Sequence, residues 1–161
     1  MDIVRRAGLA GSLVTVLVLL VGVAAPALAV TVDAQTRQAL IDAMHDEYQA
    51  RAFYQAVIAK FGWVRPFANI VRSEEQHVSL LRPLFEKYGI TVPADTFAAK
   101  AQAPGTLREA CAIGVKAEQD NIALYERFLA FVKEPDIITV FTHLRDASAN
   151  AHLPAFSRCA N

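Results

Sequence analysis

Five residues with metal-binding side chains occur where the helical pattern of this 161-residue sequence calls for apolar residues. They are Glu47, Glu74, His77, Glu118 and His152. A charge inside a helical bundle is costly unless it is paired or bound to a metal. Glu74 and His77 form a Glu-x-x-His pair, and this spacing puts a carboxylate and an imidazole on one helical face. Carboxylate-bridged di-iron and di-manganese bundles use the same spacing.

The distances from the predicted turns bring these residues to one level. In an antiparallel hairpin, residues equally far from the turn lie side by side. Around the glycine that ends the first helix, Glu47 lies 15 residues before the turn and His77 lies 15 after it. Around Pro135, Glu118 lies 17 residues before and His152 lies 17 after. We therefore predict one layer of ligands for iron or manganese, with a metal-free polar network as the alternative.

Helical spacing of apolar residues recurs along the whole chain after its first thirty residues. Steps of three and four predict amphipathic helices over residues 34–61, 64–88, 106–133 and 136–158. The predicted turns contain helix-breaking residues, namely Gly62, Gly89, Pro104, Gly105 and Pro135. No strand-like alternation of useful length is present, so the predicted fold class is all-α.

The connection between the second and third predicted helices is long. It runs from Ile90 to Gly105, and 16 extended residues span at most about 55 Å. The second helix is about 36 Å long at 1.5 Å per residue, so the connection can cross the whole bundle. A short turn of helix is expected around Asp95 to Lys100. One long crossover between two hairpins is the arrangement of a ferritin-like four-helix bundle.

Two cysteines lie at the same distance from the second hairpin turn. Cys111 is 24 residues before Pro135 and Cys159 is 24 after it, so the two should face each other. We predict a disulfide between them, and two buried free thiols are the alternative.

The N-terminal residues have the layout of a secretory signal. Arg5 and Arg6 precede 26 uncharged residues, 7–32, and Pro26 is followed by the small-residue triplet that ends at Ala29. We predict a signal peptide over residues 1–29 and an exported, periplasmic or secreted bundle over residues 30–161. The alternative is a membrane anchor through residues 7–32, because the run is long enough to span a bilayer.

The charge balance narrows the choice of partners. The chain has 16 basic and 16 acidic side chains, which argues against a nucleic-acid partner because such binding needs a basic surface. Metal ions are the predicted partners. A homodimer is left open.

Several short motifs resemble known families. Residues 47–51 (Glu-Tyr-Gln-Ala-Arg) with Tyr54, and residues 73–77 (Ser-Glu-Glu-Gln-His), resemble the first hairpin of rubrerythrin-like members of the ferritin superfamily. Residues 114–122 (Gly-Val-Lys-Ala-Glu-Gln-Asp-Asn-Ile), 135–137 (Pro-Asp-Ile) and 152–156 (His-Leu-Pro-Ala-Phe) are similar to the exported family called domain of unknown function 2202. The resemblance implies a ferritin-like bundle with di-metal carboxylates, and it implies no established reaction.

The chain departs from these patterns in its second half. The family usually has Asp at the position of Asn121, and Ala149 replaces the Glu expected three residues before His152. The segment from Ser148 to His152 is also one residue longer, an insertion that helices often absorb as a π-bulge. Pro154 should remove a helical hydrogen bond and kink the helix that presents His152.

These departures make the two halves of the predicted site unequal. Glu47, Glu74 and His77 form a complete half-site, whereas Glu118 and His152 lack a carboxylate of their own, with Asp146 and Asn150 as the only nearby substitutes. Tyr54, Tyr125 and Asn121 are predicted to surround the ligands, and packed core tyrosines are the alternative for the first two. His152 must be neutral to coordinate, so we expect binding there to weaken as pH falls toward about 6.5.

Two functions remain open at this point. The first is an exported di-iron or di-manganese protein that performs oxidation or removes peroxide. The second is a degenerate bundle without a working di-metal site, which acts as a binding or structural module.

Overall fold

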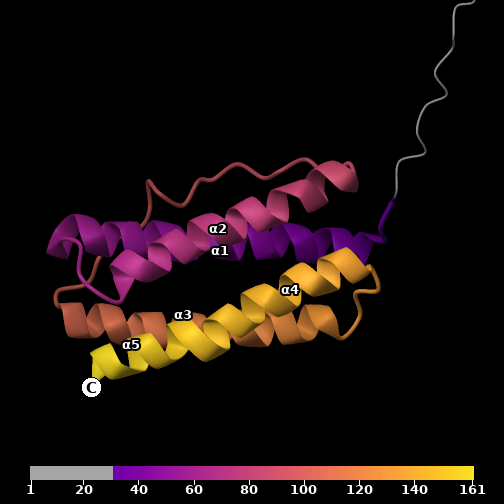
Figure 1. Ribbon diagram of the computed structural model, residues 1–161. Helices are drawn as coiled ribbons and strands as arrows, with labels where there is room; N and C mark the ends of the chain where they lie inside the picture. Colours follow the sequence, from indigo (N-terminus) through magenta and orange to yellow (C-terminus); the bar gives the residue numbers. More distant parts are fainter. Residues whose placement is uncertain (1–30) are drawn as a thin grey trace, which may run out of the picture.

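The computed structural model describes residues 31–161, and its helices pack as two antiparallel hairpins (Figure 1). The elements are α1 (Ala34–Phe61), α2 (Phe67–Lys87), α3 (Leu107–Leu129), α4 (Pro135–Ala147), the π-helical turn η1 (Ser148–His152) and α5 (Leu153–Ala160). No strand occurs in these residues, which confirms the predicted all-α class. The predicted signal peptide falls on residues outside the described part, and so does the alternative anchor except for its last two residues, 31 and 32. No helix from residue 31 onward is long and apolar enough to cross a membrane.

Capping residues mark where the helices begin and end. Asp33 accepts a hydrogen bond from the backbone N–H of Thr36 at 2.7 Å and caps α1. Gly62 ends that helix with a φ of 85°, a conformation that favours glycine. Thr106 and Glu109 form a reciprocal capping box at the start of α3. The first predicted helix has the observed bounds.

Two of the predicted helices extend beyond the observed ones. The second helix begins at Phe67 rather than residue 64, because Pro66 lies at its N-terminal cap and residues 62–65 form the turn. The third helix ends at Leu129 rather than residue 133. The chain must leave that helix early because Pro135 already begins α4.

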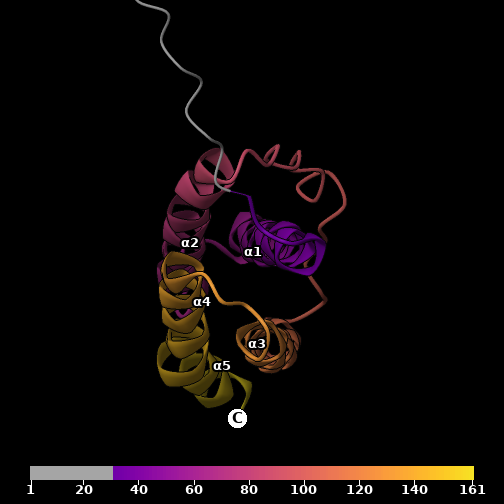
Figure 2. The ribbon, with the colours of Figure 1, turned by 90° about the vertical axis from the view of Figure 1, so that its right-hand side faces the viewer.

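The long crossover lies along α1, away from the second hairpin (Figure 2). Arg51 of α1 forms an ion pair of 2.6 Å with Asp95, and Lys60 donates a hydrogen bond of 2.6 Å to the carbonyl of Pro104. The expected short helix here is a single turn, in which the carbonyl of Phe97 accepts from Lys100 and Ala101. These contacts fasten the crossover at both ends of its path.

The second hairpin returns through a helix with one π-helical turn. The backbone N–H of Leu153 bonds to the carbonyl of Ser148, five residues earlier, which is the π pattern. The turn η1 covers the segment predicted to hold an extra residue. It ends at His152, two residues before Pro154, which occupies the first turn of α5, where a proline is tolerated.

The apolar core consists of two clusters with a polar layer between them. One cluster centres on Leu81, Tyr125 and Phe141, and the other on Phe67 and Phe156. Along the helices, Glu74, His77, Glu118 and His152 fall between the residues of these two clusters, and Glu47 lies at the edge of the first cluster, beside Tyr48. All five are buried.

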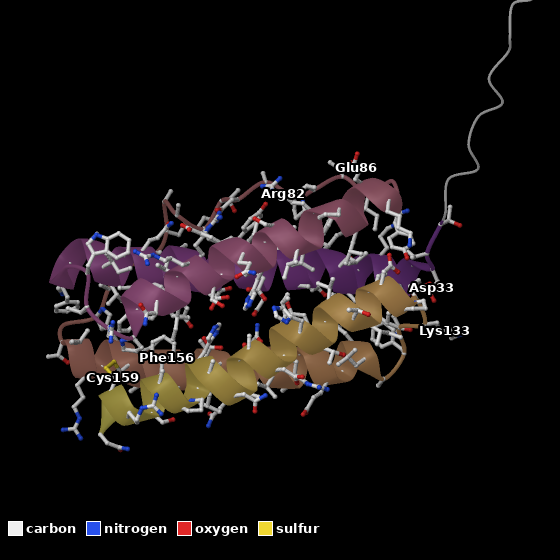
Figure 3. The ribbon with its side chains drawn as sticks, viewed as in Figure 1. Asp33, Arg82, Glu86, Lys133, Phe156 and Cys159 are labelled. Atoms are coloured by element: carbon white, nitrogen blue, oxygen red, sulfur yellow. A yellow bond between two sulfur atoms is a disulfide. The ribbon has the colours of Figure 1, made fainter. Side chains whose placement is uncertain are left out.

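The disulfide between Cys111 and Cys159 closes one end of the second hairpin, with its Cα atoms 5.7 Å apart. Phe156 and Cys159 lie at this end of the bundle, and Asp33 and Lys133 lie at the opposite end (Figure 3). Gly114 lets α5 approach α3 closely, because a Cβ there would lie 2.7 Å from the Phe156 ring. The disulfide and this close contact together position the helix that follows His152.

Candidate metal centre

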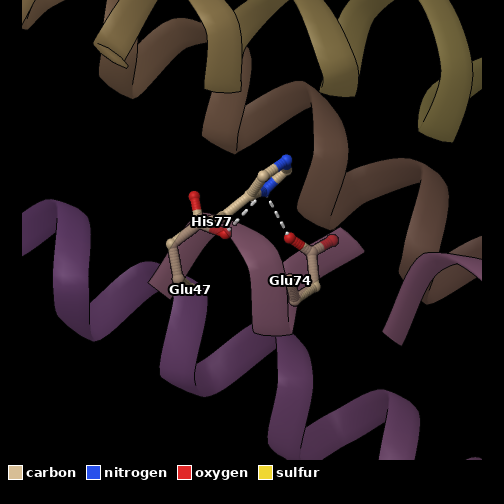
Figure 4. Close-up of side chains that lie close together, drawn as sticks. All are labelled: Glu47, Glu74 and His77. Carbon is tan, nitrogen blue, oxygen red and sulfur yellow. Dashed lines mark hydrogen bonds and ion pairs between the residues drawn. The ribbon is translucent and has the colours of Figure 1, made fainter. Parts of the chain in front are cut away.

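The first hairpin brings together the complete half-site that the sequence predicts (Figure 4). Nδ1 of His77 lies 2.8 Å from Oε2 of Glu74, one helical turn away on α2. The same nitrogen lies 3.0 Å from Oε2 of Glu47 on α1. We call these three residues the Glu47 triad.

The second hairpin supplies a matching group, which we call the Glu118 triad: Glu74, Glu118 and His152. Nδ1 of His152 lies 3.3 Å from Oε1 of Glu74 and 3.4 Å from Oε2 of Glu118. It makes a hydrogen bond with neither, although it is fully buried. A buried ring nitrogen without a hydrogen bond is costly, so its position between two carboxylates requires an explanation.

Glu74 belongs to both triads. Its Oε2 faces His77 and its Oε1 faces His152. The second half-site has no further carboxylate of its own, as expected, but Glu74 is shared, so each triad contains two carboxylates and one imidazole. The substitutes proposed from the sequence play no part: Asp146 pairs with Arg145, and Asn150 is exposed.

Two buried tyrosines connect the hairpins through the ligand carboxylates. The hydroxyl of Tyr54 on α1 donates to Oε1 of Glu118 on α3 at 2.7 Å. The hydroxyl of Tyr125 on α3 donates to Oε1 of Glu47 on α1, also at 2.7 Å. Each tyrosine thus orients a ligand on the opposite hairpin and leaves the second oxygen of that carboxylate facing the imidazole.

Asn121 lies one step farther from the ligands than predicted. It donates to Asp46 at 2.6 Å and accepts from Ser148 at 2.7 Å. These bonds tie α3 to α1 and to the start of η1. Asn121 therefore holds the Ser148 side chain at the start of the turn that presents His152, and its hydrogen bonds go to no ligand carboxylate.

Ser73 was missed in the sequence interpretation. Its Oγ lies 3.0 Å from Nε2 of His152 and 3.3 Å from Nε2 of His77. The two imidazoles are stacked with their ring centroids 5.6 Å apart, and the hydroxyl contacts both. The available signal was its position four residues before His77, which puts both side chains on one helical face.

Comparison with known protein families gives a match over the first hairpin and most of the crossover. Residues 36–103 match the family described as Uncharacterized protein domain (DUF2202). The predicted resemblance to that family is confirmed over this stretch, which contains Glu47, Glu74 and His77. No curated protein matches the chain.

Two solved structures are similar to the whole bundle. The crystal structure of hypothetical protein MJ0754 from Methanococcus jannaschii has a TM-score of 0.73 and 25% sequence identity, over 81% of this chain and 82% of that one. That of the conserved hypothetical protein rv2844 from Mycobacterium tuberculosis has a TM-score of 0.64 and 18% identity, over 80% and 98%. The similarity to rv2844 shows that the two proteins share a fold.

The carboxylates strongly favour protonated imidazoles in the metal-free protein. Burial opposes the charge, but the bonds to Glu47 and Glu74 outweigh it and raise the pKa of His77 to about 10. For His152, burial is likewise outweighed by Glu118 and Glu74, and its pKa rises to about 9. The ordinary histidine value of about 6.5 used in the sequence prediction is therefore wrong for this site.

The two carboxylates around His77 respond in opposite directions. Burial and the charge of Glu74 raise the pKa of Glu47 to about 8, against the lowering effect of His77. Burial would also raise the pKa of Glu74, but the neighbouring imidazoles of His152 and His77 lower it to about 2. At neutral pH, Glu74 is therefore charged, while Glu47, His77 and His152 each hold a proton.

The donor set suits hard or borderline divalent ions. In each triad, one ligand atom from each residue lies within 4.8 Å of the others. Carboxylate oxygens with imidazole nitrogens are ligands for iron and manganese, and zinc also accepts them. Nδ1 of both imidazoles points at the carboxylates, while Nε2 of both points at the Ser73 hydroxyl, which is how a metal-binding histidine is usually held.

Proposed function

We propose that this chain binds two divalent ions, iron or manganese, in a ferritin-like carboxylate and histidine centre. Glu47, Glu74 and His77 hold one ion, and Glu74, Glu118 and His152 hold the other. The observation that supports this proposal most directly is the position of His152 Nδ1. This atom is buried, makes no hydrogen bond and faces two carboxylates. A bound cation would supply the missing partner.

Charge balance supports two ions. With both imidazoles neutral, the three carboxylates contribute three negative charges to a buried layer, which is an expensive arrangement without cations. Two divalent ions bring four positive charges. In their absence, the protons on Glu47, His77 and His152 serve the same purpose, so metal binding exchanges protons for cations.

Iron or manganese in this centre would supply redox chemistry with dioxygen or peroxide, and we propose oxidation or peroxide removal as the activity. The protein contributes Glu74, which faces both imidazoles, and two buried tyrosines. Burial and the neighbouring carboxylates raise the pKa of Tyr54 and Tyr125 well above the ordinary value, so both phenols stay protonated and keep donating. The disulfide fits an exported protein in an oxidising compartment such as the periplasm.

A metal-free bundle that serves as a binding or structural module is the second candidate. One observation favours it: His77 already has two carboxylate partners at 2.8 and 3.0 Å, so the Glu47 triad is satisfied by protons alone. The two candidates differ in what happens when metal is offered.

The deciding experiment is a titration of the chelator-treated protein with Fe²⁺ and Mn²⁺ under anaerobic conditions, with metal analysis of the product. We expect two ions per chain in the wild type and none bound tightly in Glu74→Gln, which alters both triads. Glu75→Gln is the matched control, because Glu75 is exposed on the same helix. Optical spectra of the iron-loaded protein before and after exposure to air test the redox activity. Wild type that binds no metal above background rejects the proposal in favour of the metal-free module.

A further inference from the structure

A cavity of about 140 Å³ connects the surface to the ligand layer between α1 and α3. Its outer wall contains exposed residues, Gln49 on α1 and Asp120 on α3. Its inner wall contains the buried carboxylates Glu74 and Glu118. The cavity therefore reaches two members of the Glu118 triad, and neither Glu47 nor His77 lines it.

Small side chains keep this opening wide. Ala50 on α1 and Ala117 on α3 both line the cavity, at positions where larger residues would fill it. A water molecule needs about 10–15 Å³ of such space, so the cavity has room for a cation with several of its waters. The carboxylate of Asp46 also lines the wall and is fixed by the hydrogen bond from Asn121.

We propose that this cavity, which we call the α1–α3 port, is the route by which divalent cations reach and leave the centre. The inference rests on the proposed function. It assigns a role to Ala50 and Ala117, which bind nothing themselves and set the width of the path. The cavity ends at Glu74 and Glu118, so a cation that arrived there would face two carboxylates of the Glu118 triad.

The width of such a route affects the association and dissociation rates of the cation and leaves its dissociation constant unchanged. A side chain that narrows it slows association and dissociation by the same factor, because the ion takes the same path in both directions. A residue that shapes the ligands would instead change the dissociation constant. The ratio of the two effects separates a route from a structural role.

The test is stopped-flow binding of Co²⁺ to the metal-free, disulfide-bonded chain, followed by its visible absorption, with release measured after mixing with a chelator. Ala50→Leu and Ala117→Leu each add about three methylene-sized groups to opposite walls of the port, so one can substitute for the other if either fails to fold. Ala123→Leu is the matched control, because Ala123 is exposed on α3 outside the port. Circular dichroism and thermal unfolding verify folding.

We expect both port variants to slow association and release by about 10-fold or more, with dissociation constants within about twofold of wild type and control rates unchanged. Wild-type rates in both folded variants would overturn the port. So would a changed dissociation constant at unchanged association rate, because the alanines would then act on the ligands. Wild type that binds no Co²⁺ at equilibrium would instead reject the proposed function, and the port with it.

Discussion

The two triads contain the same residue types but rest on different backbones. The Glu47 triad lies on two regular α-helices joined by a short turn, and its imidazole makes hydrogen-bond-length contacts of 2.8 and 3.0 Å. The Glu118 triad takes His152 from a π-helical turn, and the corresponding distances are 3.3 and 3.4 Å without a hydrogen bond. The imidazole of His77 is therefore within hydrogen-bond distance of both its carboxylates, whereas that of His152 is slightly farther from each of its own.

The difference shows what a one-residue insertion in a helix can do. The π turn shifts His152 relative to a regular helix, and no carboxylate from its own helix accompanies it. Glu74 compensates from α2 by turning its second oxygen toward His152. The two positions are therefore coupled through one carboxylate, although their imidazoles come from different hairpins.

The sharpest way to separate the triads is to remove one imidazole at a time. We expect the Glu47 triad to bind the tighter ion, because its three ligands lie on regular helices. His77→Ala should weaken that binding by more than about 100-fold, because even outer contacts to a metal ligand are worth 10–100-fold. We expect His152→Ala to remove the weaker event and spare most of the tight one. His143→Ala is the control, since His143 is exposed near the site. The measurement is a calorimetric Mn²⁺ titration, and equal losses in both variants would contradict the ranking.

The triads should also differ in how steeply their affinity depends on pH. Near pH 7, Glu47 and His77 each hold a proton, with pKa values of about 8 and 10, whereas the Glu118 triad holds one on His152, with a pKa of about 9. Binding must displace these protons. Between about pH 6 and 7.5, affinity should therefore rise about 100-fold per pH unit at the Glu47 triad and about 10-fold at the other. Proton release in weakly buffered titrations measures both slopes.

The same protons stabilise the metal-free fold. The folded pKa values of His77, His152 and Glu47 all lie above their ordinary values, so their contribution is complete below those ordinary values and is lost as pH rises through about 8 to 10. The chelated protein should unfold at lower temperature as pH increases from 7 to 10. The unfolding temperature of the metal-loaded protein should fall less over this range, because its ligands have already released their protons. An equal fall in both forms would mean that the protons are held by other residues.

The level of each ligand along the bundle could be predicted from the sequence, because hairpin geometry depends only on distance from the turn. Glu47 and His77 are equidistant from the first turn, and Glu118 and His152 from the second; the structure brings the members of each pair together in one layer. The disulfide followed from the same reasoning. Helix periodicity and turn residues were also sufficient for the all-α class and the crossover.

The contacts within the layer could not be predicted in this way. Which oxygen of Glu74 faces which imidazole depends on side-chain rotamers and on a helix spacing that differs by fractions of an ångström. The same holds for the crossed hydrogen bonds of Tyr54 and Tyr125, each of which reaches the other hairpin. The pKa of His152 was misjudged because an isolated imidazole was assumed, whereas Glu74 and Glu118 surround it.

The disulfide provides a way to loosen one triad without touching a ligand. It connects Cys111 and Cys159, 48 residues apart, and the chain-entropy estimate for such a loop is about 4 kcal/mol. We expect the Cys111→Ser/Cys159→Ser protein to lose up to about this much stability in urea unfolding. Because the bond anchors α5 behind His152, Mn²⁺ affinity should fall at the Glu118 triad and change little at the Glu47 triad. A uniform loss would indicate general loosening of the bundle.

The smallest change concerns Ser73, whose hydroxyl contacts both imidazoles. A hydroxyl oxygen has two lone pairs, so it can accept from Nε2–H of His77 and of His152 at once when both Nδ1 atoms bind metal. Ser73→Ala should remove both bonds and lower affinity at each position by about 10-fold, the lower range for such supporting contacts. The loss should be slightly greater at the Glu118 triad, because the contact to His152 is 3.0 Å and that to His77 is 3.3 Å.

Ser79→Ala is the matched control for this prediction, because Ser79 lies on the same helix, is exposed and bonds only to the carbonyl of Glu75. The Mn²⁺ titrations should be made at a pH where both positions fill, with thermal unfolding of the chelated proteins alongside. A loss confined to one position would mean that Ser73 supports a single imidazole, and the two triads would then be coupled through Glu74 alone. Ser73→Ala should also lower the unfolding temperature of the chelated protein at neutral pH, because the protonated imidazoles of His77 and His152 donate from Nε2 to the same oxygen.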